Sequence, residues 1–341
     1  MEGLPASGTA PSLPTMAEQI AVDQISPDTF TSRVHPQRMG NAAPIAYGGC
    51  TAGVAVHSAC LTLPQDSNSN FHLYSVLGAF HGPTRIDRKL KCVVTRTRST
   101  KTFQTRRVVA SQTMDDGSER TCADFFVDFH VREAELFGYS ARPSMGYGVG
   151  PMDPTHTAPT IEVAERLVRD GHISREAAEA NGKMFAMAES FFETRQCTDG
   201  VSGQNLMGLA KDLTTTQDDR HITDKTSAEW LRTRTPLANE AENCAALAFI
   251  MDGALSFLPL NLDHKNFGDS GACSTLDFAL RVMRPGVRMD GWHFRERRTV
   301  AAAAGRSYSE SRLWDEGGGM VAVMTQSCII RPPPAGTKAK L

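Results

Sequence analysis

The feature that most constrains this chain is an internal repeat with a spacing of about 200 residues. Residues 115–117 read Asp-Asp-Gly and residues 315–317 read Asp-Glu-Gly, each between two apolar stretches. Sequences of this kind favour tight turns between antiparallel strands. Four strand-like stretches flank the two turns: 102–113, 121–132, 299–314 and 320–331. The repeat therefore predicts two copies of one antiparallel unit.

Each copy also contains a stretch rich in small residues. Residues 47–63 read YGGCTAGVAVHSACLTL and residues 239–255 read NEAENCAALAFIMDGAL. Both predict a helix that packs closely against its surroundings. A curved antiparallel sheet wrapped around such a helix buries the apolar sides of both elements. We therefore predict an α+β protein of two tandem hotdog domains, each a curved sheet around a long helix.

The repeat also sets the expected domain boundaries. We predict a disordered tail at 1–19, which is rich in Pro, Ser, Thr and Ala, and an N-terminal hotdog domain at 20–135. A linker at 136–185 leads to a C-terminal hotdog domain at 186–335, and 336–341 form a second tail. Two copies in one chain mimic a hotdog dimer, so a monomer can fold, and pairing of sheet edges into a homo-oligomer stays open.

Composition excludes several classes of protein. The chain has 341 residues, with 36 Lys and Arg against 38 Asp and Glu, for a formal net charge of −2. This balance indicates neither nucleic-acid binding nor a polybasic membrane surface. No apolar run reaches the roughly 18 residues that span a bilayer, and the N-terminus does not read as a secretory signal.

Metal and cofactor motifs are absent from the sequence. The eight cysteines contain no C-x-x-C pair and are mostly in apolar contexts, as expected for reduced core thiols. The ten histidines contain no H-x-x-x-H pair, and neither G-x-G-x-x-G nor a phosphate-loop pattern occurs. We therefore expect neither a metal nor a cofactor.

The last three residues indicate a cellular address. Ala339, Lys340 and Leu341 resemble the Ser-Lys-Leu tripeptide that the peroxisomal import receptor reads at a free C-terminus. The sequence therefore predicts localisation to the peroxisome.

One polar side chain interrupts the apolar face of the strand predicted at 320–331. Every second residue from Met320 to Ile330 is apolar except Gln326, so its amide is expected to point into the core. An unpartnered buried amide costs roughly 1–3 kcal/mol. Gln326 therefore either binds a backbone carbonyl or has a functional role.

Asp252 lies at the end of the second predicted helix, on the face of Ala248 and Phe249. Burial and the helix C-terminus both disfavour the carboxylate anion and should raise its pKa. A carboxylate with a raised pKa is an effective general base near neutral pH. The alternative is that Asp252-Gly253 only terminates the helix.

Thr275 lies in a strand-like run at 272–285, where threonine is common for structural reasons. Asp277 is expected on the same strand face and is a competing acid. At an offset of 200 residues, Gln326 matches Phe126 and Asp252 matches Ala52. Because the polar residues occur only in the second copy, this comparison favours a function over a purely structural role.

These stretches, taken together and in this order, resemble the acyl-CoA thioesterase II family, double-hotdog thioesterases of bacteria and peroxisomes. The resemblance covers roughly 30–132 and 186–332. In the first copy it is carried by YGG, GAFHGP (78–83) and TFQTRRVVASQ (102–112). In the second it is carried by FIMDGALSFLPL (249–260), STLDFALRVMRP (274–285), AGRSYSESRLWDEGGGMVA (304–322) and TQSCIIR (325–331).

The resemblance implies an enzyme that hydrolyses acyl-CoA to a free acid and CoA. The catalytic aspartate, threonine and glutamine of the family fall on Asp252, Thr275 and Gln326. In this interpretation Asp252 deprotonates a water that Thr275 and Gln326 orient, and no acyl-enzyme forms.

The sequence departs from the family beside Thr275. The family's strand reads Asp-His-x-Met-Trp-Phe-His-Arg-Pro, whereas residues 277–285 read DFALRVMRP, and a histidine common near position 77 is missing. The acyl group therefore stays open. One alternative is an inactive acyl-CoA-binding protein. Another is a peroxisomal enoyl-CoA hydratase, although the Asp-x-x-x-x-His spacing of that class does not occur.

Overall fold

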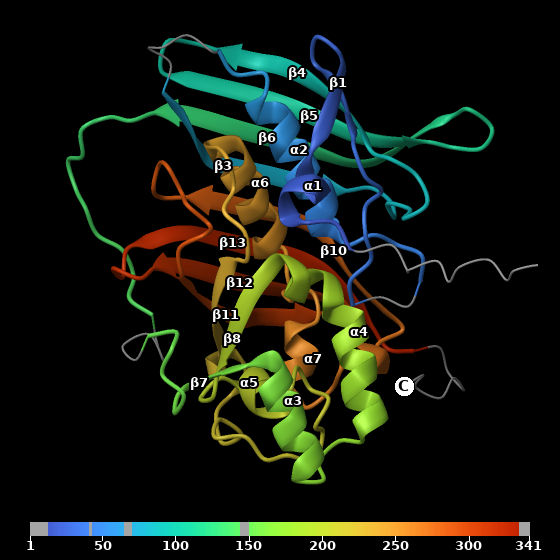
Figure 1. The fold of residues 1–341 in the computed structure, drawn as a ribbon, viewed down its shortest axis with the longest axis vertical. Helices are drawn as coiled ribbons and strands as arrows, with labels where there is room; N and C mark the ends of the chain where they lie inside the picture. The colour runs from blue at the N-terminus through green and yellow to red at the C-terminus, as the bar shows by residue number, and fades with distance from the viewer. Residues whose placement is uncertain (1–12, 41–42, 65–69, 144–149, 334–341) are drawn as a thin grey trace, which may run out of the picture.

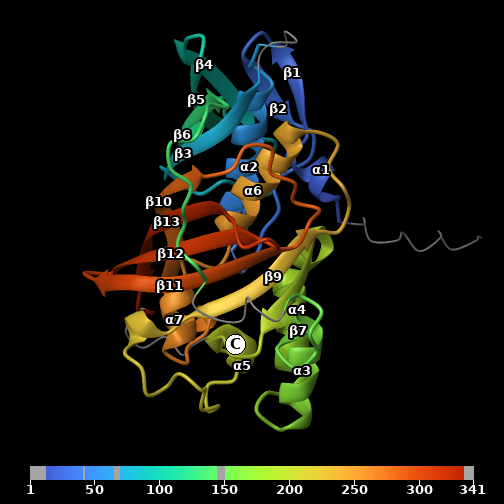
Figure 2. The same ribbon diagram turned by 90° about the vertical axis from the view of Figure 1, so that its left-hand side faces the viewer.

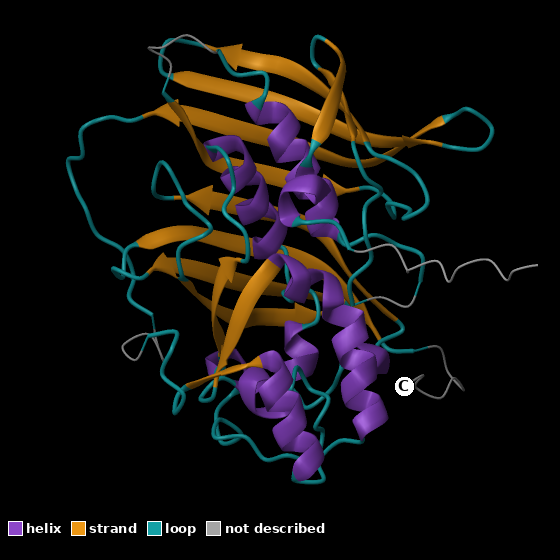
Figure 3. Ribbon diagram, viewed as in Figure 1, coloured by secondary structure: helices purple, strands orange, loops and turns teal. Residues whose placement is uncertain are grey.

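The computed structural model describes residues 13–40, 43–64, 70–143 and 150–333. A large curved antiparallel sheet lies against two central helices, α2 and α6 (Figure 1). Each half of the chain contributes one of these helices and the strands that surround it, as the repeat predicted. Figure 3 shows both helices on the concave side of the sheet.

The first half begins with short elements and ends in four long strands: α1 (Met16–Ile20), β1 (Val22–Ser26), β2 (Thr29–Ser32), α2 (Gly48–Cys60), β3 (Phe71–Phe80), β4 (Lys91–Ser99), β5 (Phe103–Thr113) and β6 (Glu119–Val131). A connecting region follows: β7 (Thr157–Pro159), α3 (Thr160–Arg169) and α4 (Arg175–Phe191). The second half contains β8 (Phe192–Cys197), α5 (Val201–Asn205), η2 (Ile222–Asp224), β9 (Ser227–Thr233), α6 (Glu240–Met251), α7 (Leu258–Leu262), η3 (Phe267–Asp269), β10 (Ala272–Val282), β11 (His293–Ala303), β12 (Arg306–Asp315) and β13 (Met320–Arg331).

The two halves share one sheet. The strand order is β1-β2-β4-β5-β6-β3-β10-β13-β12-β11-β9-β8-β7, so β3 of the first half pairs directly with β10 of the second. At this junction Leu77 lies opposite Ala279 and Gly78 lies opposite Phe278. The two halves therefore join through backbone hydrogen bonds as well as through their helices.

Small side chains explain how the two central helices pack. In α2 every residue from Gly49 to Cys60 is buried, and α2 packs along α6 (Figure 2). A Cβ on Gly53 would lie 3.2 Å from the carbonyl oxygen of Ala245, so the backbones approach closely here. The side chain of Asn239 accepts the N–H of Glu242 at 2.9 Å and fixes the start of α6.

Both predicted turns connect long strands. Residues 114–118 join β5 to β6, with Gly117 at φ 80°, and residues 316–319 join β12 to β13, with Gly318 at φ 81°. Glycine adopts such positive φ values without steric cost. The second turn therefore relies on Gly318, one position after the Asp-Glu-Gly tripeptide.

The N-terminal and linker predictions need correction. Residues 16–19, expected in a disordered tail, belong to α1 (Met16–Ile20), because Thr15 and Glu18 make a capping box and Met16 and Ile20 are buried. The region predicted as a linker contains β7, which pairs with β8 at the edge of the sheet. The predicted boundary at residue 186 falls inside α4, whose last turns are held by buried Met187 and Phe191.

The eight cysteines are free and buried, as the sequence predicted. None of the helices in the described ranges is long and apolar enough to cross a membrane. The C-terminal tripeptide at 339–341 lies outside the described residues.

Candidate active site

Asp252, Thr275 and Gln326 lie together, although they come from three separate elements. Asp252 is the residue directly after α6, Thr275 is on β10, and Gln326 is on the neighbouring strand β13. Asp252 and Gln326 are buried, and Thr275 is partly buried. The end of a central helix thus meets the inner face of two paired strands.

Hydrogen bonds connect the three side chains. Gln326 Nε2 donates to Asp252 Oδ1 at 2.6 Å. The hydroxyl of Thr275 lies 3.4 Å from the same carboxylate oxygen and 3.4 Å from Gln326 Oε1. Gln326 Nε2 also lies 3.4 Å from the backbone carbonyl oxygen of Asp252. The carboxylate is therefore the closer hydrogen-bond partner of the Gln326 amide, which explains how this amide is tolerated inside the core.

The first half contributes the beginning of α2 to this site. The backbone N–H of Gly49 donates to the Asp252 carboxylate, and the positive end of the helix dipole favours an anion there. A Cβ on Gly48 would lie 2.8 Å from Asp252 Oδ2 and 3.0 Å from the ring of Phe80. Glycine at position 48 thus lets the carboxylate approach the helix. Sequence reasoning missed this contribution, although the Gly-Gly pair that opens the helix was its signal.

Burial dominates the electrostatics of Asp252. Loss of solvent raises the pKa of the Asp252 carboxyl to about 6, against the lowering effect of hydrogen bonds from Gln326, Thr275 and the Gly49 N–H. Such a carboxyl is ionised at neutral pH and accepts a proton more readily than an exposed aspartate. The arrangement is therefore suited to activating a water molecule.

Asp277, the competing acid, is exposed and faces away from the site. The pairing of β10 with β13 shifts register between Thr275 and Asp277. This irregularity adds a residue between them, so the two side chains do not share a face. The expectation that they do is wrong for this reason.

The register of the strands also corrects the comparison between the two copies. Gln326 lies opposite Phe278, and Phe125 lies opposite Gly78 at the matching place in the first half. The counterpart of Gln326 is therefore Phe125, which is buried, and not the exposed Phe126. Matching the helix ends likewise pairs Asp252 with Leu61, the residue after α2. Neither counterpart is polar.

Three phenylalanine rings lie beside the polar residues. The ring centroids of Phe80, Phe125 and Phe278 are 6.0 to 6.2 Å apart. A Cβ on Gly78 would lie 2.5 Å from the Phe278 ring. Phe278, which replaces the family's histidine, therefore fits because the residue opposite it across the junction is glycine. These rings give the site an apolar wall.

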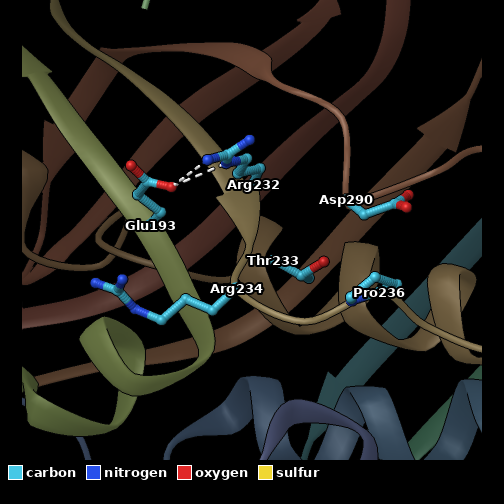
Figure 4. Close-up of a pocket in the computed structure, with 6 residues that line it drawn as sticks. All are labelled: Glu193, Arg232, Thr233, Arg234, Pro236 and Asp290. Atoms are coloured by element: carbon cyan, nitrogen blue, oxygen red, sulfur yellow. Dashed lines mark hydrogen bonds and ion pairs between the residues drawn. The ribbon is translucent and has the colours of Figure 1, made fainter. Parts of the chain in front are cut away.

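A polar pocket of about 300 Å³ lies elsewhere, on the second half (Figure 4). Arg232 donates two hydrogen bonds to Glu193 at its rim. The pocket is lined by Glu193, Arg232, Thr233, Arg234, Pro236 and Asp290. It shares no residue with the Asp252 site.

Two family models match the chain. The acyl-CoA thioesterase N-terminal domain matches residues 35–130, and the acyl-CoA thioesterase C-terminal domain matches residues 194–330. The fold and these matches define a double-hotdog thioester hydrolase. In particular, the chain belongs to the acyl-CoA thioesterase family, as the resemblance implied, and its reaction is hydrolysis of acyl-CoA.

Solved structures share the fold at low sequence identity. Acyl-CoA thioesterase II TesB2 from Mycobacterium marinum is 18% identical, with a TM-score of 0.64 over 95% of this chain and 99% of that one. A putative thioesterase II from Thermobifida fusca is 12% identical, with a TM-score of 0.63 over 95% and 99%. The tesB protein of Mycobacterium avium subs. paratuberculosis is 15% identical, with a TM-score of 0.61 over 93% and 98%. A comparison with curated proteins gives no match.

Proposed function

We propose that this thioesterase hydrolyses acyl-CoA with Asp252 as general base and with Thr275 and Gln326 as the groups that orient the attacking water. The observation that carries the assignment is the buried contact of 2.6 Å between Gln326 Nε2 and Asp252 Oδ1. It places an amide donor and a carboxylate of raised pKa at one point beside the start of α2.

The chemistry proceeds in two steps. Asp252 takes a proton from water while the water oxygen forms a bond to the thioester carbon, which gives a tetrahedral oxyanion. The start of α2 lies beside the Asp252 carboxylate, and the positive end of the helix dipole there is suited to stabilise that oxyanion. Collapse of the intermediate breaks the carbon–sulfur bond, and the proton on Asp252 passes to the CoA thiolate.

The decisive experiment follows thiol release from a panel of short, medium, long and branched acyl-CoAs. We expect Asp252→Asn to abolish release, because an amide cannot accept the proton, and the exposed Asp277→Asn to leave it unchanged. Full activity of Asp252→Asn would overturn the assignment of the base. Thiol release by neither the wild type nor the variant would instead indicate an inactive acyl-CoA-binding protein.

We propose further that Ala339, Lys340 and Leu341 direct the enzyme to the peroxisome, where it acts on fatty or related acyl-CoAs. The support is the likeness of this tripeptide to the address that the import receptor reads. A fluorescent protein fused to the N-terminus should accumulate in peroxisomes. Deletion of the three residues should leave it in the cytosol, and unchanged localisation would contradict the proposal.

We also propose that copies of the chain associate into a homo-oligomer through the outer face of the first half's sheet. Leu77 and Phe126 are each 41% exposed and lie opposite one another on β3 and β6, and Val93 on β4 is 40% exposed. Sedimentation of the wild type and of Phe126→Lys tests this proposal. A smaller species is expected for the variant, and a monomeric wild type would contradict it.

A further inference from the structure

The last turn of α6, which ends next to Asp252, is held by two side chains from other elements. The hydroxyl of Tyr47 donates to the carbonyl oxygen of Phe249 at 2.7 Å, and the guanidinium of Arg295 donates to the carbonyl oxygen of Ile250. The final carbonyls of a helix lack partners within it. Here two of these carbonyls, two and three residues before Asp252, are bound by buried side chains.

Arg295 itself is fixed by a buried charge cluster. Arg295 on β11 lies opposite Glu229 on β9, and its Nε donates to Glu229 Oε1 at 2.8 Å. Arg297 and Gln196 donate to the other carboxylate oxygen at 3.3 and 2.8 Å. Burial opposes ionisation of Glu229, but the two guanidinium groups lower the pKa of its carboxyl to about 2.

Such a cluster is poorly explained by stability alone. Burying ions costs several kcal/mol each, and apolar residues of similar volume are often as stabilising. This cluster holds two cations for one carboxylate, and Arg295 is the member that reaches the end of α6. The geometry of the cluster therefore indicates that Arg295 has a role at the end of α6.

Tyr47 connects the same helix end to the first half. It is the residue directly before α2, and its ring packs edge-on against Phe249 with centroids 5.0 Å apart. A Cβ on Gly49 would lie 2.2 Å from that ring and 2.5 Å from the Phe249 carbonyl oxygen. The Tyr47 side chain thus lies where the start of α2 meets the end of α6.

We propose that Tyr47 and Arg295 are positioning residues, which hold the last turn of α6 so that the Asp252 carboxylate meets both the Gly49 N–H and the Gln326 amide. The inference rests on the proposed role of Asp252 as the base. Misplacement of a reacting group by about 1 Å can cost up to 10²-fold in rate. The contacts of Tyr47 and Arg295 with α6 should therefore affect kcat and not substrate binding.

The groups around Asp252 fix the direction of the expected pH effect. Tyr47 and Cys50 at the start of α2 and Cys328 on β13 interact electrostatically with the Asp252 carboxylate. The charge cluster of Arg295, Arg297 and Glu229 lies behind Tyr47. Hydrogen bonds from Gly49 and Gln326 lower the pKa of the Asp252 carboxyl. A displaced carboxylate loses these bonds, so its pKa rises and the acid limb of kcat/KM moves to higher pH.

Tyr47→Phe and Arg295→Lys test the proposal, with Tyr74→Phe as the matched control. Phenylalanine removes only the hydroxyl, and lysine keeps the charge near Glu229 but lacks the fork that also reaches Ile250. Tyr74 packs against Phe103 and His130 on the first half's sheet. For Tyr47→Phe we expect kcat to fall about tenfold, KM to stay within about twofold of wild type, and the acid limb to move to higher pH. For Arg295→Lys we expect kcat and the acid limb to change in the same direction.

The readouts separate the outcomes. Unchanged kcat and an unchanged acid limb in well-folded Tyr47→Phe overturn the positioning role. A lower kcat that only tracks a loss of folded protein, with the acid limb in place, overturns it equally. If Asp252→Asn is inactive while Tyr47→Phe behaves as wild type, the positioning role alone fails. Full activity of Asp252→Asn instead refutes the proposed base.

Discussion

Phe278 lies directly opposite Gly78 at the junction between the two halves, and its ring occupies the space that any side chain at position 78 would need. The added Cβ of Gly78→Ala would lie 2.5 Å from the Phe278 ring and 2.8 Å from the Phe125 ring. Overpacking of this kind costs about 1–3 kcal/mol. We expect thermal unfolding of Gly78→Ala at a lower temperature than wild type.

Gly82→Ala is the control, because nothing lies within 4 Å of its added Cβ. Combining Gly78→Ala with Phe278→Leu should recover part of the loss, since the smaller side chain gives room. Equal melting temperatures for Gly78→Ala and wild type would contradict the packing argument.

The pH dependence of catalysis should follow the ionisation of Asp252. Burial raises the pKa of its carboxyl to about 6, and only the ionised form accepts a proton from water. We expect kcat/KM to decline as pH falls below about 6, in proportion to the ionised fraction. Activity that is constant down to pH 4.5 would exclude a base with this pKa.

Ionisation of Asp252 should lower the stability of the fold, although it is required for activity. Because the pKa of Asp252 is higher in the folded state than in the unfolded chain, its contribution to stability is complete at low pH and is lost as pH rises through about 6. Asp252→Asn should therefore be more stable than wild type at pH 8, by the order of 1–3 kcal/mol. Denaturant unfolding at pH 8 and at pH 4.5 tests this, and the difference should shrink at the lower pH.

Gln326→Glu changes one atom of the side chain but replaces the donor that faces Asp252 by a second carboxyl group. Repulsion between the two groups raises the pKa of the base, and the orienting amide is lost. We expect kcat to fall about 10²–10³-fold, as for loss of other preorganised donors, and the acid limb to move upward. Gln24→Glu on the exposed face of β1 is the control and should be fully active.

Thr275 is expected to act through its hydroxyl, which lies 3.4 Å from both Asp252 Oδ1 and Gln326 Oε1. Thr275→Ser keeps this group and should retain most activity. Thr275→Val keeps the shape without the hydroxyl and should lower kcat about tenfold, as for loss of one hydrogen bond in the transition state. Similar rates for the two variants would assign Thr275 a packing role only.

Much of the fold follows from patterns that are local in the sequence. The small-residue stretches predicted α2 and α6, and the two turns predicted the long hairpins, because each pattern is complete within one segment. α1 was missed because five residues carry little periodicity, and its stability comes from burial against other segments.

The site was predictable only in part. Gln326 and Asp252 are anomalous within their own segments, but their convergence with Thr275 came from a family resemblance. The role of Gly49 depends on the packing of α2 against the end of α6, and the correct counterpart of Gln326 depends on strand register. A shift of one residue exchanges the two faces of a strand, so a fixed offset of 200 selected Phe126 where the structure has Phe125.

The pairing of β3 with β10 has a consequence for the enzyme as a single polypeptide. The carboxylate belongs to one half and the helix start that faces it belongs to the other, so neither half would hydrolyse anything when produced alone. The covalent tether keeps the two edges at a high effective concentration. Mixing separately expressed halves should therefore restore turnover only at concentrations high enough for β3 of one half to pair with β10 of the other.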